Sequence, residues 1–341
     1  MGHLRNKEGE TKILFAYSVM SSFVRKDLEI LERNYKVKTL EVMTFLVPRR
    51  GRSPLIFLRL LSEILWADLV YCWFADLNAF FAVFFCTFLH KKCLIVVGGY
   101  EVAYVPEIGY GALLHSLGRL RVKFILRHAA KVLAVSGSNE KEILQLTRPR
   151  NLKMVYNGVD TKQFKPSGAK EKWVITVGGI SDSTVKKKRL DTFVKSSVYL
   201  PDIRFILIGK AYDNSIKHLK RIAGSNVEFT DYVSDESLLH YYQKAKVYCQ
   251  LSAQESFGVA LAEAMSCCCV PVVTRRYALP EVVGDTGFYV PYNDGKATAE
   301  AIRKALKSDK GMKARERIRK YFSIMMREKN LLKEISDLTK N

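Results

Sequence analysis

The chain has 341 residues, which is more than one ordinary core needs, so two domains of about 150 residues each are expected. Its hydrophobic fraction of 48% and mean hydropathy of −0.04 are typical of a globular protein and exclude a disordered or fibrous class. The formal net charge is +21 and is spread along the chain, since residues 1–156 hold 23 Lys and Arg against 13 Asp and Glu.

Targeting and metal signals point to a cytoplasmic protein. Residues 1–10 are polar, and no apolar segment of the signal-peptide type follows them. The strongest membrane-span candidate, residues 77–89, is shorter than the ~20 residues needed to cross a bilayer, so a buried crossover helix is predicted there. The seven cysteines lack a CxxC pair and a histidine at metal spacing. Buried thiols, a reducing compartment and no metal site are therefore expected.

The first half reads as strands that alternate with helices. Strands are predicted at residues 12–19, 37–42, 69–73, 93–97 and 132–135. Helices are predicted at residues 23–32, 55–66, 77–89, 113–127 and 140–146, the last with Ser138 as its N-cap. Such alternation indicates parallel βαβ units.

The pattern restarts after a link. A strand is predicted at residues 154–160, and Pro166, Ser167 and Gly168 mark the link at 161–171. Further strands are predicted at residues 173–177, 203–208, 227–230, 247–251 and 270–274, with a helix at 190–198. We expect a first domain of residues 1–165, joined by a C-terminal helix at about 323–341, and a second domain of residues 166–322.

The stretch 255–263 carries the strongest chemical pattern. It follows a predicted strand and opens a helix predicted at residues 259–265, and Gly258 removes a side chain where a ligand would approach. The amides of Phe257, Gly258 and Val259, with Ser256 before them, suit a phosphate at this helix start.

Two glutamates flank this predicted phosphate site. Glu255 and Glu263 are separated by roughly 12 Å along the helix axis. One carboxylate can accept hydrogen bonds from two neighbouring hydroxyls, so the pair suits a nucleotide sugar, which has a diol at each end of a diphosphate. The alternative is that Glu255 only favours the positive helix end and Glu263 is a solvated helix position.

A second anion-binding pattern follows the strand predicted at 173–177. Gly178 and Gly179 allow the backbone to approach an anion. Residues 186–189 are all basic and are predicted to lie at the next helix start. Lys188 is the residue expected to stabilise a departing diphosphate. The alternative is an ordinary solvated lysine-rich loop.

Basic residues also gather beside apolar ones at 49–52, which precede the helix predicted at 55–66, and at 119–131. This combination favours an anionic membrane surface as a partner. No nucleic acid is expected, because an aromatic-basic RNA signature and a reading helix are lacking. A generally basic, solvated face is the alternative.

Taken in order, these motifs resemble retaining glycosyltransferases of the GT-B architecture, in the large group that contains sucrose synthase and phosphatidylinositol mannosyltransferase. The resemblance covers residues 132–292 well and the first half weakly. It is carried by Val135-Ser136, Asn157-Gly158-Val159-Asp160, Val177-Gly178-Gly179, Lys188, Leu207-Ile208-Gly209, Glu255 and Glu263 (an E-x7-E spacing), and residues 264–265, 271–273 and 280–287. It implies an α/β protein of two Rossmann-like domains whose parallel sheets face across a cleft.

The resemblance also implies roles. Glu255 would hold the donor sugar's hydroxyls and Glu263 the ribose, and the amides of residues 257–259 would meet the diphosphate or hexose. Lys188 would stabilise the departing phosphate, and the base would pack near Val233. The donor would be a nucleotide sugar such as a UDP- or GDP-sugar, with no metal or other cofactor required. The acceptor would be a glycan, and the basic face of the chain suggests a lipid-linked or membrane-bound one.

This chain departs from the family at two positions. Gly179 stands where the family commonly has Arg, and Lys187 or Arg189 is the expected replacement. Gly99-Tyr100-Glu101 stands where a histidine is often found, so Glu101 is expected to contact the sugar or the acceptor. The alternatives are a nucleotide-sugar epimerase or hydrolase of the same fold, and a non-catalytic basic protein that binds a membrane or nucleic acid.

Overall fold

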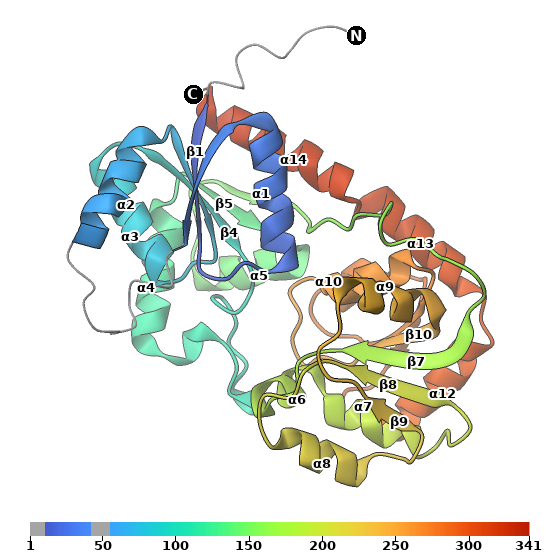
Figure 1. The fold of residues 1–341 in the computed structure, drawn as a ribbon. Coiled ribbons are helices and arrows are strands. Elements are labelled where there is room, and N and C mark those ends of the chain that lie inside the picture. Colours follow the sequence, from blue (N-terminus) through green and yellow to red (C-terminus); the bar gives the residue numbers. More distant parts are fainter. Residues whose placement is uncertain (1–10, 42–54, 341) are drawn as a thin grey trace, which may run out of the picture. The chain divides into compact units, whose positions relative to one another are not determined.

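The computed structural model describes residues 11–41 and 55–340, which form two units (Figure 1). The first unit comprises residues 11–41, 55–106, 111–156 and 327–340, and the second comprises residues 107–110 and 157–326. The chain thus passes between the units after Pro106, Tyr110, Tyr156 and Met326. Residues 1–10 and the basic stretch 49–52 lie outside the described residues.

The first unit is built on a parallel sheet of six strands in the order β2-β1-β3-β4-β5-β6. The strands are β1 (Lys12–Tyr17), β2 (Lys36–Glu41), β3 (Leu69–Trp73), β4 (Lys92–Val97), β5 (Lys131–Ala134) and β6 (Leu152–Met154). The helices are α1 (Ser22–Asn34), α2 (Leu55–Trp66), α3 (Leu77–Phe88), α4 (Ser116–His128), α5 (Gly137–Leu146) and α14 (Ile324–Thr339).

Both faces of this sheet are covered, as its continuous apolar strands require. Leu14 and Val70 join a core with side chains of α2 to α5. Helix α3 is the crossover helix predicted at residues 77–89, and one side of it is buried. Ala79 and Val83 pack into the core, whereas Phe88 on the opposite side is 68% exposed.

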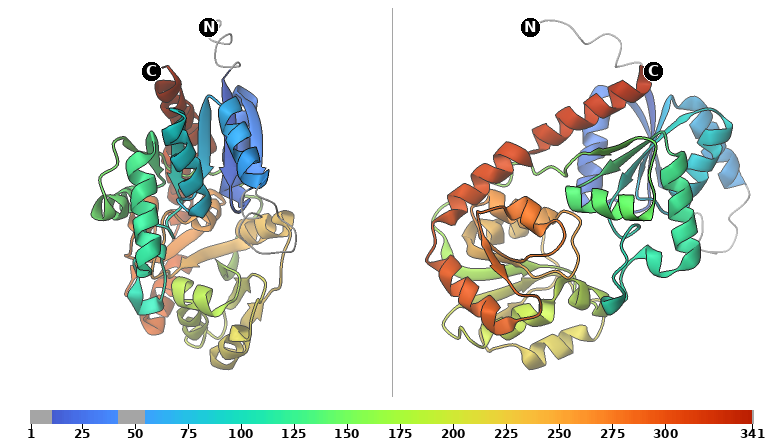
Figure 2. Two further views of the ribbon diagram at one scale, coloured as in Figure 1. Left: turned by 90° about the vertical axis from the view of Figure 1, so that its left-hand side faces the viewer. Right: turned by 180° about the vertical axis from the view of Figure 1, so that it is seen from behind.

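Helix α14, drawn in red in Figure 2, belongs to the first unit from Arg327 onward. A buried ion pair attaches it there. The Arg327 guanidinium donates to both carboxylate oxygens of Asp27 on α1, at 2.5 and 2.6 Å, and to the carbonyls of Val155 and Tyr156. The Tyr71 hydroxyl and the indole N–H of Trp73 donate to the same carboxylate at 2.6 and 2.9 Å. Because each charge is surrounded by hydrogen-bond partners, the pair is tolerated in the core.

The second unit is built on another parallel sheet of six strands, in the order β12-β11-β10-β7-β8-β9. The strands are β7 (Glu171–Val177), β8 (Arg204–Ile208), β9 (Val227–Phe229), β10 (Ala245–Gln250), β11 (Val270–Thr274) and β12 (Phe288–Val290). The helices are α6 (Asp182–Lys188), α7 (Leu190–Ser197), α8 (Ser215–Ile222), α9 (Asp235–Lys244), α10 (Val259–Ser266), α11 (Leu279–Val283), α12 (Gly295–Leu306) and α13 (Lys310–Tyr321).

The strand order in this unit reverses beside β7. From β7 the chain proceeds to β8 and β9 on one side, and then returns to β10 on the other side. Open α/β sheets bind ligands at the carboxyl ends of the strands, where the order reverses. The loops after β7 and β10 therefore define the place to look for a site.

Three local predictions need correction. The N-cap of α5 is Ser136 and not Ser138, because the Ser136 hydroxyl accepts from the amide of Asn139 at 3.0 Å. The strand predicted at 154–160 ends as β6 at Met154, before the Asn157-Gly158 turn. Lys188 ends the short helix α6 and does not begin a helix.

No helix within the described ranges is both long and apolar enough to cross a membrane.

Candidate functional site

The loops that follow β7 and β10 meet at the carboxyl edge of the second unit's sheet. The amide of Ala253, in the β10 loop, donates to the carbonyl of Lys187, near the end of α6, at 2.7 Å. The candidate residues predicted in these two loops therefore lie at the same edge of one sheet.

Gly258 sets the start of α10. Its φ of +89° lies in the left-handed region, which favours glycine. The helix begins at Val259, and its first N–H groups have no carbonyl four residues earlier within the helix. The preceding Ser256 and Phe257 are buried, and the ring of Phe257 lies 5.6 Å from the ring of Phe322. Packing thus fixes the loop that presents this helix start.

Glu255 is held by a chain of hydrogen bonds that starts on β10. The Tyr248 hydroxyl donates to the Gln250 side-chain oxygen at 3.1 Å, and the Gln250 amide donates to Oε2 of Glu255 at 3.0 Å. The Glu255 carbonyl also accepts from the amide of Ala278 at 3.2 Å. Glu255 remains partly exposed, so its carboxylate is oriented by the protein and also open to solvent.

Glu263 lies on α10 and is 6% exposed. The Tyr242 hydroxyl is 3.5 Å from its Oε2. Burial raises the pKa of Tyr248 well above its ordinary value, and the nearby carboxylates of Glu255 and Glu263 raise it further. Because both carboxylates act on the same hydroxyl, they lie near the same side chain of β10.

Lys188 packs against Gly178. A Cβ atom built on Gly178 would lie 2.8 Å from Cδ of Lys188, so glycine leaves the space that the lysine occupies. Burial lowers the pKa of the Lys188 ammonium, whereas the Glu255 carboxylate raises it and Lys187 lowers it. The Lys188 side chain thus lies on the glycine at the point where the strand order reverses.

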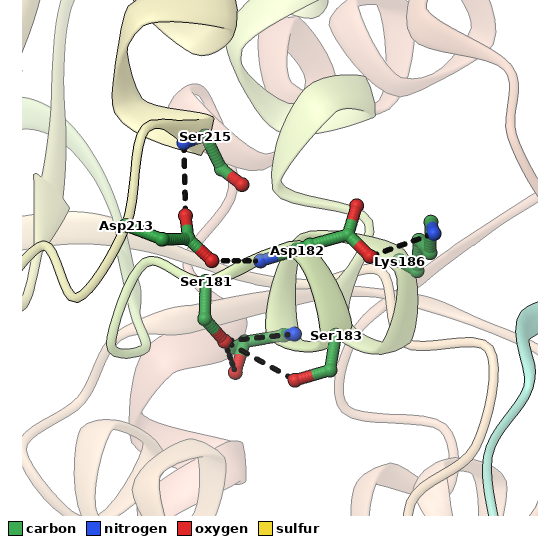
Figure 3. Close-up of polar contacts among 7 residues, drawn as sticks. Ser181, Asp182, Ser183, Lys186, Asp213 and Ser215 are labelled. Carbon is green, nitrogen blue, oxygen red and sulfur yellow. Dashed lines mark hydrogen bonds and ion pairs between the residues drawn. The ribbon is translucent and has the colours of Figure 1, made fainter.

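The loops after β7 and β8 are joined by Asp213 (Figure 3). Its carboxylate accepts from the amide of Asp182 at 2.9 Å and from the amide of Ser215 at 2.8 Å, so one side chain binds the first turns of α6 and α8. Lys186 pairs with Asp182 at 2.7 Å on the exposed side of α6. The lysines of α6 thus differ in placement, and Lys188 is the one that packs on the glycine.

The two expected replacements for an arginine at position 179 have other partners. Lys187 donates to the Tyr110 hydroxyl at 2.9 Å. Arg189 donates to Asp191 at 2.9 Å and to Asn293. Position 179 itself remains a glycine beside the exposed side chain of Tyr212.

Val233 lies between β9 and α9, in a segment connected to the β8 loop. Thr230 Oγ1 accepts from the amide of Gly209 at 3.2 Å. Val233 is partly buried, and the neighbouring Tyr232 is exposed. The segment predicted to hold the nucleotide base therefore lies at the same edge of the sheet as Gly178 and Gly179.

Glu101 belongs to the first unit and is buried against backbone. Its carboxylate accepts from the amides of Ala75 and Gly98 at 3.0 Å each, and of Gly99 at 2.8 Å. Burial raises the pKa of this carboxyl, and these backbone hydrogen bonds lower it. Such an arrangement holds together the loops after β3 and β4.

Sequence reasoning missed Tyr242, Tyr248 and Gln250, which orient the two acidic residues. Residues 248 and 250 point to the same face of β10, because side chains alternate along a strand. Polar side chains at alternate positions of β10, Lys246, Tyr248 and Gln250, were the available signal for the last two. Among the described residues, no group of three or more His, Cys, Asp and Glu side chains is arranged to hold a metal ion.

Comparison with known proteins points to one family. Residues 160–323 match the family of glycosyl transferases group 1. A similar relative is the GDP-mannose:cellobiosyl-diphosphopolyprenol alpha-mannosyltransferase of Xanthomonas oryzae pv. oryzae, 26% identical over 182 residues. That match covers 50% of this chain and 47% of the relative, so the chain spans about half the length of that relative.

Two solved structures share the fold of nearly the whole chain. Sucrose-phosphate synthase from Thermosynechococcus elongatus has a TM-score of 0.77 at 17% identity, over 96% of this chain and 99% of that one. The Anabaena protein Alr3699/HepE, in complex with UDP and glucose, has a TM-score of 0.77 at 16% identity, over 96% and 100%. The chain thus shares the GT-B fold of these structures, and its residues 160–323 are similar to glycosyl transferases group 1.

Proposed function

We propose that this protein is a retaining glycosyltransferase that moves a sugar from a nucleotide sugar to an acceptor. The observation that carries the proposal is that Lys188 packs on Gly178 and that the hydrogen bond from Ala253 to Lys187 holds the loop of Glu255 beside them, where the strand order of the second unit reverses. A cation beside a glycine can approach a diphosphate, and an oriented carboxylate can accept from sugar hydroxyls.

Each residue of the site has a proposed role. Glu255 accepts from hydroxyls of the donor sugar, and Glu263, the second acid of the E-x7-E spacing, accepts from the ribose. The amides at the start of α10 bind the diphosphate or the hexose, and the base packs near Val233. Lys188 stabilises the charge that grows on the diphosphate as the sugar leaves.

Glu101 receives a structural role in this proposal. Its two oxygens accept three backbone N–H groups, so it holds the loops after β3 and β4 and does not act on the sugar. This replaces the expectation that Glu101 contacts the donor or the acceptor.

The reaction proceeds on one face of the sugar. The acceptor oxygen bonds to the anomeric carbon as the bond from that carbon to the diphosphate oxygen breaks, and the acceptor proton passes to the departing diphosphate. The anomeric configuration is thereby retained without a protein nucleophile. Proton NMR of the first product formed would reveal an inverted anomer if this mechanism is wrong.

Thermal unfolding with UDP, GDP, ADP and their sugars tests the donor. A ligand at one hundred times its dissociation constant should stabilise the protein by about 2.7 kcal/mol. Glu263→Gln should remove that stabilisation, whereas Glu300→Gln, on the exposed side of α12, should keep it. A non-catalytic basic protein that binds these anions by charge alone would respond equally in both variants. An epimerase or hydrolase would consume the nucleotide sugar in the absence of any acceptor.

The acceptor in this proposal is a glycan carried on a lipid at an anionic membrane. The name of the Xanthomonas relative includes a diphosphopolyprenol, which is a lipid carrier. In the first unit, α4 has four Arg and Lys and no acidic residue, and its Leu117 and Leu120 are 80% and 65% exposed. Apolar side chains among cations favour the surface of an anionic bilayer.

Helix α3 extends this surface. The rings of Phe80 on α3 and Phe124 on α4 lie 5.0 Å apart, and Phe84 and Phe88 continue the row as exposed side chains. We call Phe84, Phe88, Leu117 and Leu120 the apolar row.

Flotation with vesicles tests the membrane assignment. The protein should float with phosphatidylglycerol vesicles and not with phosphatidylcholine vesicles. Leu117→Glu with Leu120→Glu should abolish flotation, while Leu144→Glu, an exposed leucine of α5, should not. Equal flotation of both variants would remove the apolar row from the proposal.

A further inference from the structure

We propose that Tyr212 and Lys210, on the loop after β8, complete the nucleotide-sugar site on the side of Gly179. They would supply the hydrogen bond and the charge that an arginine at position 179 provides in the family. This inference rests on the proposed function and adds two donor-binding residues to it.

The loop after β8 is fixed against the loop after β7. The amide of Ile180 donates to the carbonyl of Lys210 at 2.7 Å, and the amide of Tyr212 donates to the carbonyl of Ile180 at 2.8 Å. These two hydrogen bonds continue the parallel pairing of β7 and β8 past the strand ends. Asp213 then binds the first turns of both following helices. Tyr212 is therefore exposed on a backbone that is held in place.

Tyr212 occupies the space beside Gly179. A Cβ atom on Gly179 would lie 2.7 Å from Cε2 of the Tyr212 ring. Gly179 does not have a positive φ, so its backbone would accept other residues. The Tyr212 ring leaves no room for a side chain at position 179. We infer that position 179 is a glycine because position 212 is a tyrosine.

Gly209 brings the loops close enough for this contact. Its φ is +150°, and a Cβ atom there would lie 2.3 Å from the carbonyl oxygen of Gly178. Gly178 in turn leaves room for Lys188 on its other side. The pair Gly178-Gly179 thus has Lys188 against one member and Tyr212 against the other.

Lys210 provides the second cation of this edge. It is exposed, and its Nζ lies 6.0 Å from the centre of the Tyr212 ring. The acidic residue of the same loop, Asp213, already accepts two backbone N–H groups. With a donor bound, the Tyr212 hydroxyl donates to the diphosphate and the Lys210 ammonium offsets the charge that grows there as the sugar leaves.

Calorimetric titration with UDP, GDP and ADP tests both residues. With the diphosphate that the parent protein binds best, Lys210→Gln should weaken binding about tenfold, as expected for a lost charged hydrogen bond. Lys210→Arg should restore affinity. Tyr212→Phe should weaken binding less than Tyr212→Ala. Lys217→Gln, an exposed lysine of α8, is the matched control and should bind as the parent does.

A swap tests the relation between positions 179 and 212. Gly179→Arg should weaken binding, because the new side chain meets the Tyr212 ring. Gly179→Arg combined with Tyr212→Ala should recover most of the parent affinity, because the arginine then has both space and a role. Equal binding by the single and double variants would overturn the inference.

The outcomes separate this inference from the proposed function. If the parent binds no nucleoside diphosphate, the proposed function fails and this inference falls with it. If the parent binds one and Lys188→Met abolishes binding, while Lys210→Gln and Tyr212→Ala bind as the parent does, this inference alone is wrong. Circular dichroism of Lys210→Gln and of Tyr212→Ala should match that of the parent, since both substituted side chains are exposed.

Discussion

The two sheets are both parallel and six-stranded, and they differ in strand order and in the side chains at the point where that order reverses. In the first unit this point lies between β1 and β3, and the polar side chains there form hydrogen bonds with one another. Ser18 donates to Asp76, Asn78 donates to Ser18 at 2.9 Å, and the Asp76 carboxylate also caps α3. In the second unit the same point has Gly178 and Lys188 beside Glu255.

The comparison shows that the strand order determines where a ligand could bind. The residues of the adjoining loops determine whether it can. The polar groups of the first edge are hydrogen-bonded to one another, so they stabilise loops. Glycine in the second edge keeps the backbone accessible, and the nearby cation and acid match the parts of a nucleotide sugar. The two glutamates in these loops follow the same division, since Glu101 accepts three backbone amides and Glu255 is oriented by one side-chain amide.

The largest effect is expected from the buried pair of the first unit. Asp27→Ala leaves the Arg327 guanidinium buried without its partner and should cost about 3–5 kcal/mol of stability, as measured by urea unfolding. Asp27→Ala combined with Arg327→Met should recover part of that loss. Arg33→Ala, which breaks an exposed pair with Glu328, is the control and should cost less than about 1 kcal/mol. A small effect of Asp27→Ala would remove this pair as an anchor of the first unit.

The next effect concerns catalysis in the second unit. Lys188→Met should lower the turnover of nucleotide sugar about 100- to 1,000-fold, because a preorganised cation at the leaving group is lost. Lys186→Met removes a similar charge two residues away, on the exposed side of α6, and should leave turnover nearly unchanged. Equal turnover by both variants would show that Lys188 does not stabilise the leaving group.

A smaller effect on stability is expected at Glu101. Glu101→Gln turns an N–H₂ group toward backbone N–H groups and should cost about 1–3 kcal/mol. Since burial raises the pKa of Glu101, its folded form holds a proton more tightly than the unfolded form does. The stability from this group is then greatest in acid, below the unfolded pKa, and is lost as the pH rises through the raised pKa. Urea unfolding across that range should show a flatter pH dependence for the variant, with nucleotide affinity unchanged at neutral pH.

The smallest effect is a shift in the pH dependence of nucleoside diphosphate binding in the second unit. The pKa of Lys188 is lowered by burial and raised by Glu255. Glu255→Gln should therefore lower this pKa further, and the loss of nucleoside diphosphate affinity at alkaline pH should begin at a lower pH. Titrations at several pH values test this, and an unchanged alkaline limb would mean that Glu255 and Lys188 do not interact in solution.

The sequence was informative where a residue type has one main structural use. The apolar strands of both sheets and the glycine at 258 were predictable, because alternation with helices and a helix-opening glycine each have a clear physical meaning. The helix predicted at 55–66 and the strands predicted at 69–73 and 270–274 have the predicted bounds.

The rest depends on contacts between residues far apart in the chain. Ser136 and Ser138 are both good caps, and only the backbone decides between them. Glu101 follows a strand as an active-site acid would, yet Ala75 belongs to another loop and could not be paired with it from the sequence. The contact of Tyr212 with Gly179 joins the ends of two strands and has no local signal.

The pair of Asp27 and Arg327 has a consequence for biosynthesis. The two residues are 300 positions apart, although both lie inside the first unit. At roughly 5–20 residues per second, a ribosome needs about 15–60 s to make the intervening chain. During that time Asp27 lacks its partner, so the first unit to emerge is the last to be completed. A nascent chain that stops before residue 327 should therefore keep this part of the protein open to proteases and chaperones, even after the second sheet has formed.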